Sequence, residues 1–231
     1  MPMVPVGGMD PTFILLIGAI ALGLVAQLWV KSAFNKYSRV RSMRGVTGAQ
    51  VARDILDRNG LKNVPVEAIA GRLSDHYDPK AKVLRLSEGV YGSPSLAAIG
   101  IAAHEAGHAL QDATGYVPMK LRAGIFPMAN LGSQMLWPAV IGGVFLGFKP
   151  LLWIGILLYS FAVVFSIVTL PVEFDASRRA LAIVTSGGYL SAEEKSGARA
   201  VLTAAAMTYV AATLVAVLQL IRLLYLGRSR D

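Results

Sequence analysis

The sequence predicts an α-helical membrane protein with a small α+β domain outside the bilayer and three to four transmembrane helices. The chain of 231 residues is 55% hydrophobic and only 16% charged, whereas an ordinary soluble domain has roughly 45–50% apolar and about 25% charged residues. Long uncharged runs recur along the chain, and one stretch of ordinary charge density separates them. The chain has no cysteine, which excludes disulfide scaffolds, thiolate metal sites and cysteine nucleophiles.

The first apolar run extends from Pro11 to Val30 and predicts a helix about 30 Å long, which matches the hydrocarbon core of a bilayer. No basic residue precedes it, so it lacks the charged start of a cleaved signal peptide and reads as an uncleaved anchor. Five basic residues follow it, namely Lys31, Lys36, Arg39, Arg41 and Arg44. By the positive-inside rule, the N-terminus lies outside and the segment after Val30 lies in the cytoplasm.

Two further runs, Ala123–Phe148 and Leu151–Val172, predict a transmembrane helical hairpin because Lys149-Pro150 interrupts them. Basic residues at both open ends place these ends on the cytoplasmic side. A fourth run, Val201–Ile221, follows a capping-box pattern at Ser191 and Glu194. If it spans, the C-terminus ends outside, against the charge rule; otherwise it lies along the interface or packs on the other helices.

The ninety or so residues between the first two runs carry the signals of a small cytoplasmic α+β domain. Thr47 is expected to cap a helix that ends at Asn59-Gly60. A turn at residues 78–81 and the alternating strand 82–87 predict a hairpin, and Ser93-Pro94 is expected to start a long helix. The predicted organisation is an anchor (1–30), the α+β domain (31–122), the hairpin (123–172), a cytoplasmic segment (173–200), and a fourth membrane helix with its tail (201–231).

The long helix contains His104, Glu105 and His108 in the spacing His-Glu-x-x-His. Histidines four residues apart stand on one helix face and can reach one zinc ion, and the intervening Glu can act on zinc-bound water as a general base. Two buried core histidines and an incidental Glu would be the bland alternative, but burying three polar groups in one turn without partners is costly. The spacing therefore predicts one Zn²⁺ per chain.

A catalytic zinc needs a third protein ligand and an open position. Glu173, directly after the third apolar run, is the favoured ligand because it would face the same compartment as the histidine helix. An interfacial carboxylate paired with Arg178 or Arg179 is the structural alternative for Glu173. Asp175 is a weaker alternative ligand. His76, the third histidine of the chain, would make a closed structural site if it proved to be a fourth ligand.

Three motifs together resemble the YugP-type family of bacterial membrane zinc metallopeptidases. They are His-Glu-Ala-Gly-His-Ala-Leu-Gln at residues 104–111, Leu-Pro-Val-Glu-Phe-Asp-Ala-Ser-Arg-Arg-Ala at 170–180 and Asp-His-Tyr-Asp-Pro at 75–79, and the likeness covers nearly the whole chain. The resemblance implies a zincin-like domain, a bacterial cytoplasmic membrane, and a protein or peptide substrate that is unfolded or membrane-bound. It also implies metal ligands at His104, His108 and Glu173 and a general base at Glu105.

The chain is more distantly similar to the HtpX and CAAX-protease group of peptidases with a His-Glu-x-x-His motif and a distant Glu ligand. In that group an Asp follows the ligand Glu by four residues, whereas this chain has Ser177 at that position. Asp175 and Asp112 are then the alternatives for a carboxylate that supports a ligand.

The expected reaction is peptide-bond hydrolysis by zinc-activated water, with Glu105 taking a proton and returning it to the leaving amine. His76 is the first candidate to stabilise the oxyanion, ahead of Tyr189 and Arg178; a turn histidine beside Asp75 and Asp78 is the structural alternative. The alternating strand 83–87 is expected to offer an edge on which an extended substrate adds as a β-strand.

Three other functions compete with this hypothesis. An intramembrane protease is disfavoured because Glu88 and Asp112 bracket the histidine helix and leave no apolar run long enough to span. A non-enzymatic membrane adaptor or assembly factor would hold a structural zinc ion. Nucleic-acid binding is disfavoured despite the net charge of +8, because the basic residues flank apolar helices. The sequence does not define the oligomeric state.

Overall fold

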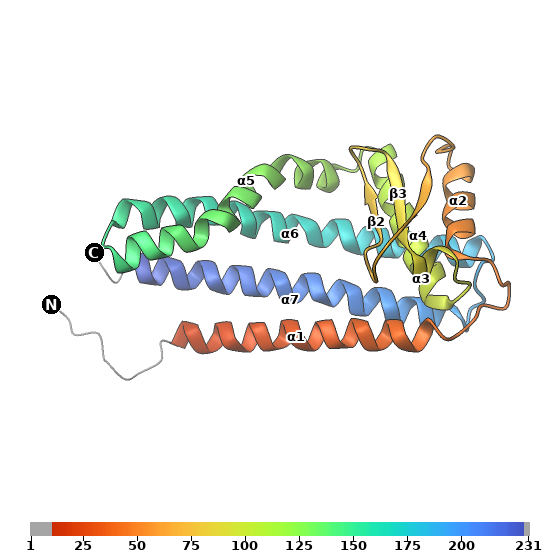
Figure 1. Ribbon diagram of the computed structural model, residues 1–231, viewed down its shortest axis with the longest axis horizontal. Coiled ribbons are helices and arrows are strands. Elements are labelled where there is room, and N and C mark those ends of the chain that lie inside the picture. Colours follow the sequence, from red (N-terminus) through yellow and green to blue (C-terminus); the bar gives the residue numbers. More distant parts are fainter. Residues whose placement is uncertain (1–10, 229–231) are drawn as a thin grey trace. The chain divides into compact units, whose positions relative to one another are not determined.

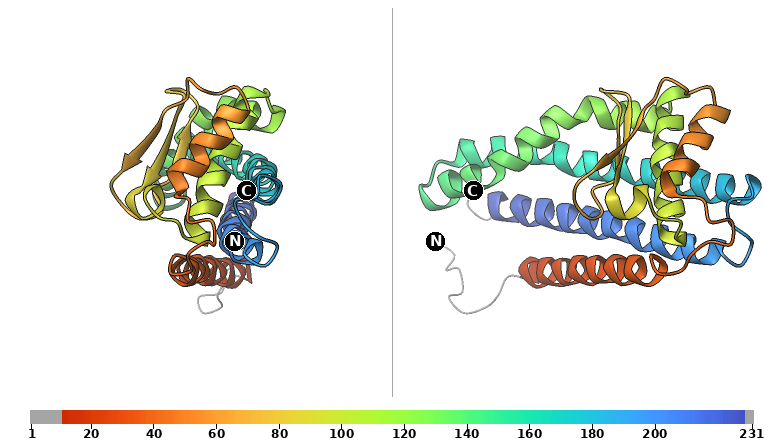
Figure 2. Two further views of the ribbon diagram at one scale, coloured as in Figure 1. Left: turned by 90° about the vertical axis from the view of Figure 1, so that its right-hand side faces the viewer. Right: turned by 45° about the vertical axis from the view of Figure 1, so that its right-hand side comes forward.

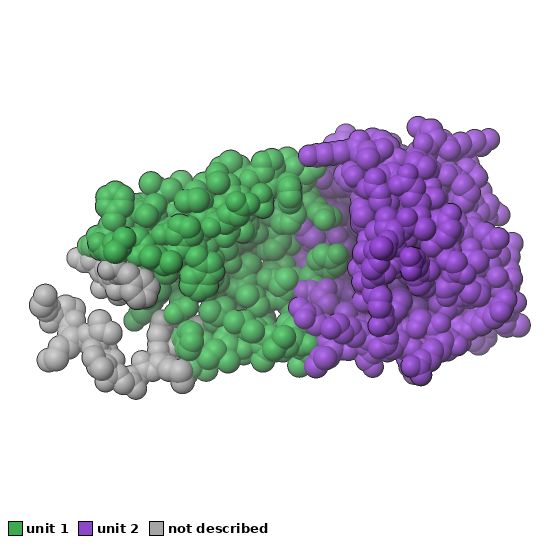
Figure 3. All heavy atoms as spheres, viewed as in Figure 1, with its two compact units in different colours: residues 1–25, 122–167, 209–231 green, residues 26–121, 168–208 purple. Residues whose placement is uncertain are grey.

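The computed structural model describes the backbone of residues 11–228 and all their side chains except those of residues 11, 12, 144 and 145. The chain forms two compact units (Figure 3). Unit 1 comprises residues 1–25, 122–167 and 209–231, and unit 2 comprises residues 26–121 and 168–208. Helices α1 (Pro11–Tyr37), α6 (Lys149–Ser186) and α7 (Lys195–Arg228) each contribute residues to both units.

Three helices in the described part of the chain are long and apolar enough to cross a membrane: α1 from Phe13, α6 and α7. Helix α5 (Val117–Val140), which corresponds to most of the second predicted run, is not among them. Its apolar residues are interrupted by Asn130, Ser133 and Gln134, and it holds Pro127 and Pro138 before giving way to the π-helical turn η1 (Ile141–Phe145). The described helices thus provide three of the three to four expected membrane segments.

Within unit 1, glycines bring α5 and the first half of α6 into close contact. A Cβ atom on Gly132 would lie 2.1 Å from the main-chain oxygen of Leu158, and one on Gly155 would lie 2.1 Å from Cβ of Ala139. Side chains larger than hydrogen would therefore separate the two helices. Figure 1 shows α5 and α6 as consecutive helices joined by a short turn.

Unit 2 contains a three-stranded sheet in the order β1-β3-β2. Strand β1 (Val66–Ile69) pairs in parallel with β3 (Val83–Ser87), and β2 (His76–Asp78) pairs antiparallel with it, Tyr77 lying opposite Leu84. The β-hairpin expected around the turn at residues 78–81 is therefore confirmed. The expected substrate edge on the strand 83–87 is wrong, because β3 is the central strand and pairs on both sides. Within this sheet β1 and β2 are the two edge strands.

The helices of unit 2 begin and end largely at the predicted signals. Thr47 caps α2 (Gly48–Arg58) in a capping box with Gln50, and Gly60 after the helix has a φ of +77°, which suits glycine. Helix α4 (Leu96–Ala113) begins two residues later than expected. Its N-cap is Ser95, whose hydroxyl accepts from the N–H of Ala98, whereas Ser93 contributes a hydroxyl bonded to Ser95.

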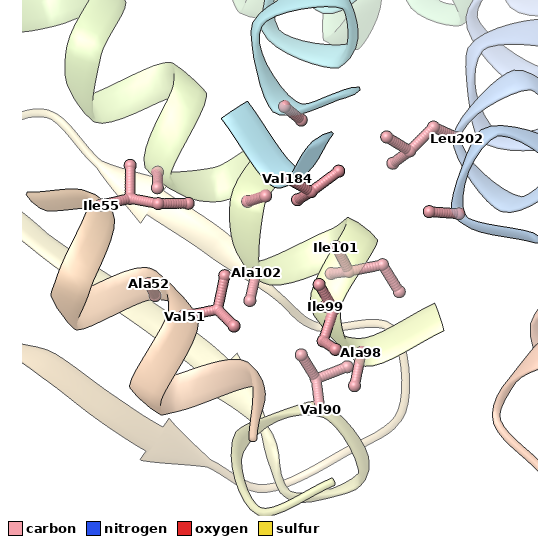
Figure 4. Packing of buried hydrophobic residues seen from close by; sticks show 14 of the residues in the cluster. Val51, Ala52, Ile55, Val90, Ala98, Ile99, Ile101, Ala102, Val184 and Leu202 are labelled. Atoms are coloured by element: carbon pink, nitrogen blue, oxygen red, sulfur yellow. The ribbon is translucent and has the colours of Figure 1, made fainter. Parts of the chain in front are cut away.

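Helix α4 lies at the centre of unit 2, between the sheet and the segments of α6 and α7 that belong to this unit (Figure 2). Val51 and Ile55 of α2, Ile99 of α4 and Val184 of α6 are fully buried in one apolar cluster (Figure 4). The short helix α3 (Glu88–Tyr91) adds Val90 to the same cluster. Burying side chains of this size stabilises a fold by about 1.5–3 kcal/mol each. The core thus fixes the position of the helix that carries the His-Glu-x-x-His motif.

Candidate metal centre

Helix α4 presents His104 and His108 on one face, one turn apart. Their ring centroids lie 4.7 Å apart, with the ring planes nearly perpendicular. The Nε2 atoms of both rings point to one oxygen of Glu173, at 3.3 Å from His104 and 3.6 Å from His108. The spacing read from the sequence therefore corresponds to two nitrogens that face one point.

Glu173 comes from α6 and completes a group of three ligand-type side chains. One ligand atom from each of His104, His108 and Glu173 lies within 4.8 Å of the others. His108 is 8% exposed and Glu173 is 3% exposed. Two imidazole nitrogens and one carboxylate oxygen are the donor set of catalytic zinc sites that keep an open position. The residues present therefore fit a zinc ion by the chemistry of their donor atoms.

Gly107 allows α4 and α6 to approach closely enough for this group to form. A Cβ atom at Gly107 would lie 3.0 Å from the main-chain oxygen of Ala176. Gly107 precedes His108, and Ala176 lies one turn beyond Glu173 on α6. The glycine inside the His-Glu-x-x-His motif thus serves the contact between the two ligand-bearing helices.

Glu105 is held by β2, one of the two edge strands of the sheet. The backbone N–H of Tyr77 on β2 donates to Oε2 of Glu105 over 3.1 Å. The hydroxyl of Tyr77 donates to Asp112, one turn beyond His108 on α4, and Lys82 forms an ion pair with the same carboxylate. Burial, followed by the bond to Asp112, raises the pKa of Tyr77 above its ordinary range. Tyr77 thus joins β2 to α4 at two points.

The Nδ1 atoms of both histidines have partners in the structure. Ser177 Oγ lies 3.1 Å from Nδ1 of His104, and Oε1 of Gln111 lies 3.0 Å from Nδ1 of His108. Asp175 does not contact a histidine directly but accepts a hydrogen bond from Gln111. Asp112, the other expected carboxylate, serves Tyr77 and Lys82 instead.

Burial by itself lowers the pKa of His108, but the bond to Glu173 and the negative charge of Glu105 outweigh it. The pKa of His108 therefore lies above its ordinary value. Asp75 directly precedes β2. Burial raises the pKa of its carboxyl group, although the carboxylate accepts hydrogen bonds from the backbone and hydroxyl of Ser87.

The three residues considered for the oxyanion are in different surroundings. His76 is exposed on β2, and its Nδ1 lies 2.8 Å from the carbonyl oxygen of Ser74. It is not in the metal-ligand group of the described residues. The hydroxyl of Tyr189 donates to Asp54, and Arg178 forms an ion pair with Asp175.

Sequence reasoning did not assign roles to Gln111 and Tyr77. Gln111 is the last residue of the motif at residues 104–111, and Tyr77 lies in the motif at residues 75–79. Gln111 follows His108 by three residues and so lies on the same helix face. Tyr77 follows His76, but its backbone N–H, the group that contacts Glu105, leaves no signal in the sequence.

Three described helices are thus long and apolar enough to span a membrane, and two histidines and one glutamate form a group that could hold a zinc ion. Residues 12–228 match the family described as "Putative neutral zinc metallopeptidase", and the chain belongs to this family. Over 208 residues it is 50% identical to "Putative membrane protease YugP" of Bacillus subtilis (strain 168), an alignment that covers 90% of this chain and 92% of the relative. No solved structure matches the chain.

Proposed function

We propose that this protein is a membrane-integral zinc-dependent endopeptidase that hydrolyses unfolded or membrane-bound protein substrates. One observation carries the proposal: the Nε2 atoms of His104 and His108 meet one oxygen of Glu173, while Glu105 of the same helix turn is held by the N–H of Tyr77. A metal-ligand group beside an anchored carboxylate is the arrangement that zinc peptidases need. The family and the relative support the same function.

His104, His108 and Glu173 would hold the zinc ion, which when bound supplies a Lewis acid for the substrate carbonyl and acidifies a water molecule. Glu105 accepts the proton of that water and later donates it to the leaving amine. Because Oε2 of Glu105 accepts from Tyr77, we expect Oε1 to be the oxygen that carries the proton. Tyr77 is then the residue that orients the base.

We propose that His76 donates a hydrogen bond to the oxyanion of the reaction. Its position on β2, next to Tyr77, places it on the strand that holds Glu105. Nδ1 of His76 faces the carbonyl oxygen of Ser74 and therefore donates to it. The ring can donate from Nε2 to a substrate oxygen only when it is doubly protonated.

The rival function, an adaptor with a structural zinc ion, would be favoured by four protein ligands. The group that the described residues form contains three ligand side chains. We therefore infer a catalytic rather than a structural ion.

We place this site on the cytoplasmic face and infer four membrane crossings. The site joins α4 to the C-terminal part of α6, so both lie on one face of the membrane. The apolar part of α6 precedes Glu173, so a spanning α6 has Lys149 on the opposite face. The chain must then cross between α4 and Lys149, through α5 and η1. Proline in α5 is compatible with this, because neighbouring helices can satisfy the freed backbone groups.

Single cysteines test this arrangement, because the chain has none of its own. Lys80→Cys lies in the exposed turn before β3, and Phe148→Cys lies in the exposed turn before α6. A membrane-impermeant maleimide applied to intact bacteria should label Phe148→Cys and should label Lys80→Cys only after the cells are opened. The opposite pattern would mean the inverse orientation, and equal labelling of both would rule out the crossing by α5.

The peptidase activity is tested with the detergent-purified chain and an unfolded model protein. Glu105→Gln should retain its bound zinc and lose roughly 10²–10⁴-fold in rate, and a chelator should abolish the wild-type activity. Equal cleavage by both proteins would make Glu105 the wrong base or the activity a contaminant. Zinc binding without cleavage of any unfolded or membrane-protein substrate would favour the adaptor.

A further inference from the structure

Gln111 is a buried polar side chain that contacts His108 of the metal-ligand group. The proposed function assigns no role to it. It lies on α4 and has no exposed surface. A buried amide must satisfy both of its ends, because an unpaired end costs about 1–3 kcal/mol. Its partners therefore decide how the amide is oriented.

The two ends of the Gln111 amide have chemically different neighbours. Nε2 donates to the main-chain oxygen of Val172 over 2.8 Å and to Oδ2 of Asp175 over 3.0 Å. Oε1 lies 3.0 Å from Nδ1 of His108. Val172 precedes the ligand Glu173, so Gln111 joins one ligand-bearing helix to the other.

The orientation of this amide follows from the chemistry of the acceptors. The main-chain oxygen of Val172 and the carboxylate of Asp175, which pairs with Arg178 and Arg179, can only accept hydrogen bonds. Turning the amide over would place its oxygen against both of them. The NH₂ group therefore faces α6, and the oxygen faces His108.

The proton position on His108 follows in turn. An amide oxygen can only accept, so Nδ1 of His108 must carry the hydrogen. In the zinc-bound state this leaves the lone pair of Nε2 for the metal, on the nitrogen that faces Glu173. Ser177, the partner of His104, imposes no such choice, because a hydroxyl both donates and accepts.

We propose that Gln111 is a positioning residue that fixes the tautomer and the ring orientation of His108 for metal binding, with Asp175 holding the amide in place. The proposal rests on the proposed zinc site but not on peptide hydrolysis. It assigns to an uncharged amide the role that a carboxylate often has behind a metal-bound histidine. Asp175, the carboxylate expected from the sequence, then acts through Gln111.

The first test needs no variant and no substrate. The chain has only three histidines, so ¹⁵N-histidine labelling of the zinc-loaded protein gives a spectrum that can be interpreted ring by ring. We expect His108 to show a protonated Nδ1 and a metal-bound Nε2. A metal-bound Nδ1 on His108 would overturn the proposal.

The second test compares zinc affinity, measured by chelator competition, in two designs. Gln111→Met keeps the length of the side chain and removes both hydrogen-bonding ends, so we expect roughly 10–100-fold weaker zinc binding. Gln111→Glu combined with Asp175→Asn keeps an acceptor for His108 and supplies a donor from position 175, but the second carboxylate oxygen at position 111 replaces the donor to the main-chain oxygen of Val172. We expect this pair to bind zinc more tightly than Gln111→Met.

If Gln111 only filled space, Gln111→Met would keep the zinc affinity of the wild type, because methionine fills the buried space without introducing a charge. Wild-type zinc affinity in Gln111→Met would therefore overturn the proposal. Unfolding midpoints of the metal-free proteins show whether each variant is folded. A wild-type chain that binds no zinc would overturn the proposed function as well, whereas a chain that binds zinc without hydrolysing peptides leaves the role of Gln111 intact.

Discussion

Gly107 contacts the main chain at Ala176 so closely that a Cβ atom at Gly107 would lie 3.0 Å from the Ala176 oxygen. This contact sets the spacing between α4, which carries two ligand-type histidines, and α6, which carries Glu173. The metal-ligand group therefore depends on a residue that has no side chain.

Gly107→Ala should weaken zinc binding and destabilise the protein. The added methyl group must push α6 away, and overpacking of this kind costs roughly 1–3 kcal/mol. Chelator competition and thermal unfolding in detergent measure the two effects. Gly89→Ala is the matched control, because a Cβ atom there meets nothing within 4 Å. Unchanged zinc affinity in Gly107→Ala would show that α6 adapts without moving its ligand.

Tyr77→Phe should lower the rate of peptide hydrolysis while leaving zinc affinity unchanged. The change removes the hydroxyl that joins β2 to Asp112 and so loosens the strand whose N–H holds Glu105. A hydrogen bond to a charged group contributes roughly 1.5–3 kcal/mol. Steady-state kinetics and zinc titration provide the measurement. Lys82→Met, which removes the other partner of Asp112, should affect the rate less; an equal effect would mean that Tyr77 matters only through Asp112.

Removal of zinc should lower the unfolding midpoint of the wild-type protein. A ligand that binds only the folded state stabilises it by about 2.7 kcal/mol at a free concentration 100 times its Kd. Chelator should therefore destabilise the wild type. His104→Ala, which lacks one ligand, should be insensitive to chelator at the same zinc concentration. A zinc-dependent midpoint in that variant would place the stabilising ion elsewhere.

Tyr189→Phe should make stability less dependent on alkaline pH. Burial, followed by the bond to Asp54, raises the pKa of Tyr189 from 10.0 to about 12. A raised pKa in the folded state contributes stability that is present below pH 10 and is lost as the pH rises towards about 12. Unfolding midpoints across this range should therefore fall less steeply in the variant than in the wild type. If the unfolding midpoints of the variant and the wild type fell equally with pH, the loss of stability at alkaline pH would come from other groups.

The hydrogen bond between Tyr189 and Asp54 also affects stability at acidic pH. The bond from Tyr189, followed by that from Arg58, lowers the pKa of Asp54 below 3.8. Its stabilising contribution is therefore present above that value and is lost as the pH falls through the lowered pKa. Asp54→Asn should reduce the acid-dependent loss of stability, which thermal unfolding at decreasing pH measures. An acid profile identical to that of the wild type would contradict this.

The sequence by itself predicted the elements that depend on local interactions. Thr47 caps α2, and the turn after Asp78 forms the hairpin, because caps and turns are decided by residues a few positions apart. The spacing of His104 and His108 placed both rings on one face by helix geometry alone. The start of α4 was missed by two residues because Ser93 and Ser95 are both suitable caps, and only Ser95 lies where its hydroxyl can reach the N–H of Ala98.

Tertiary structure alone decided what surrounds that motif. The central position of β3 follows from the parallel pairing with β1, which a hairpin pattern cannot reveal. The approach of Gly107 to Ala176, the backbone bond from Tyr77 to Glu105 and the amide of Gln111 between two helices join residues far apart in the chain. Spacing along one helix fixes which side chains share a face, but which segments meet that face is set by packing of the whole chain.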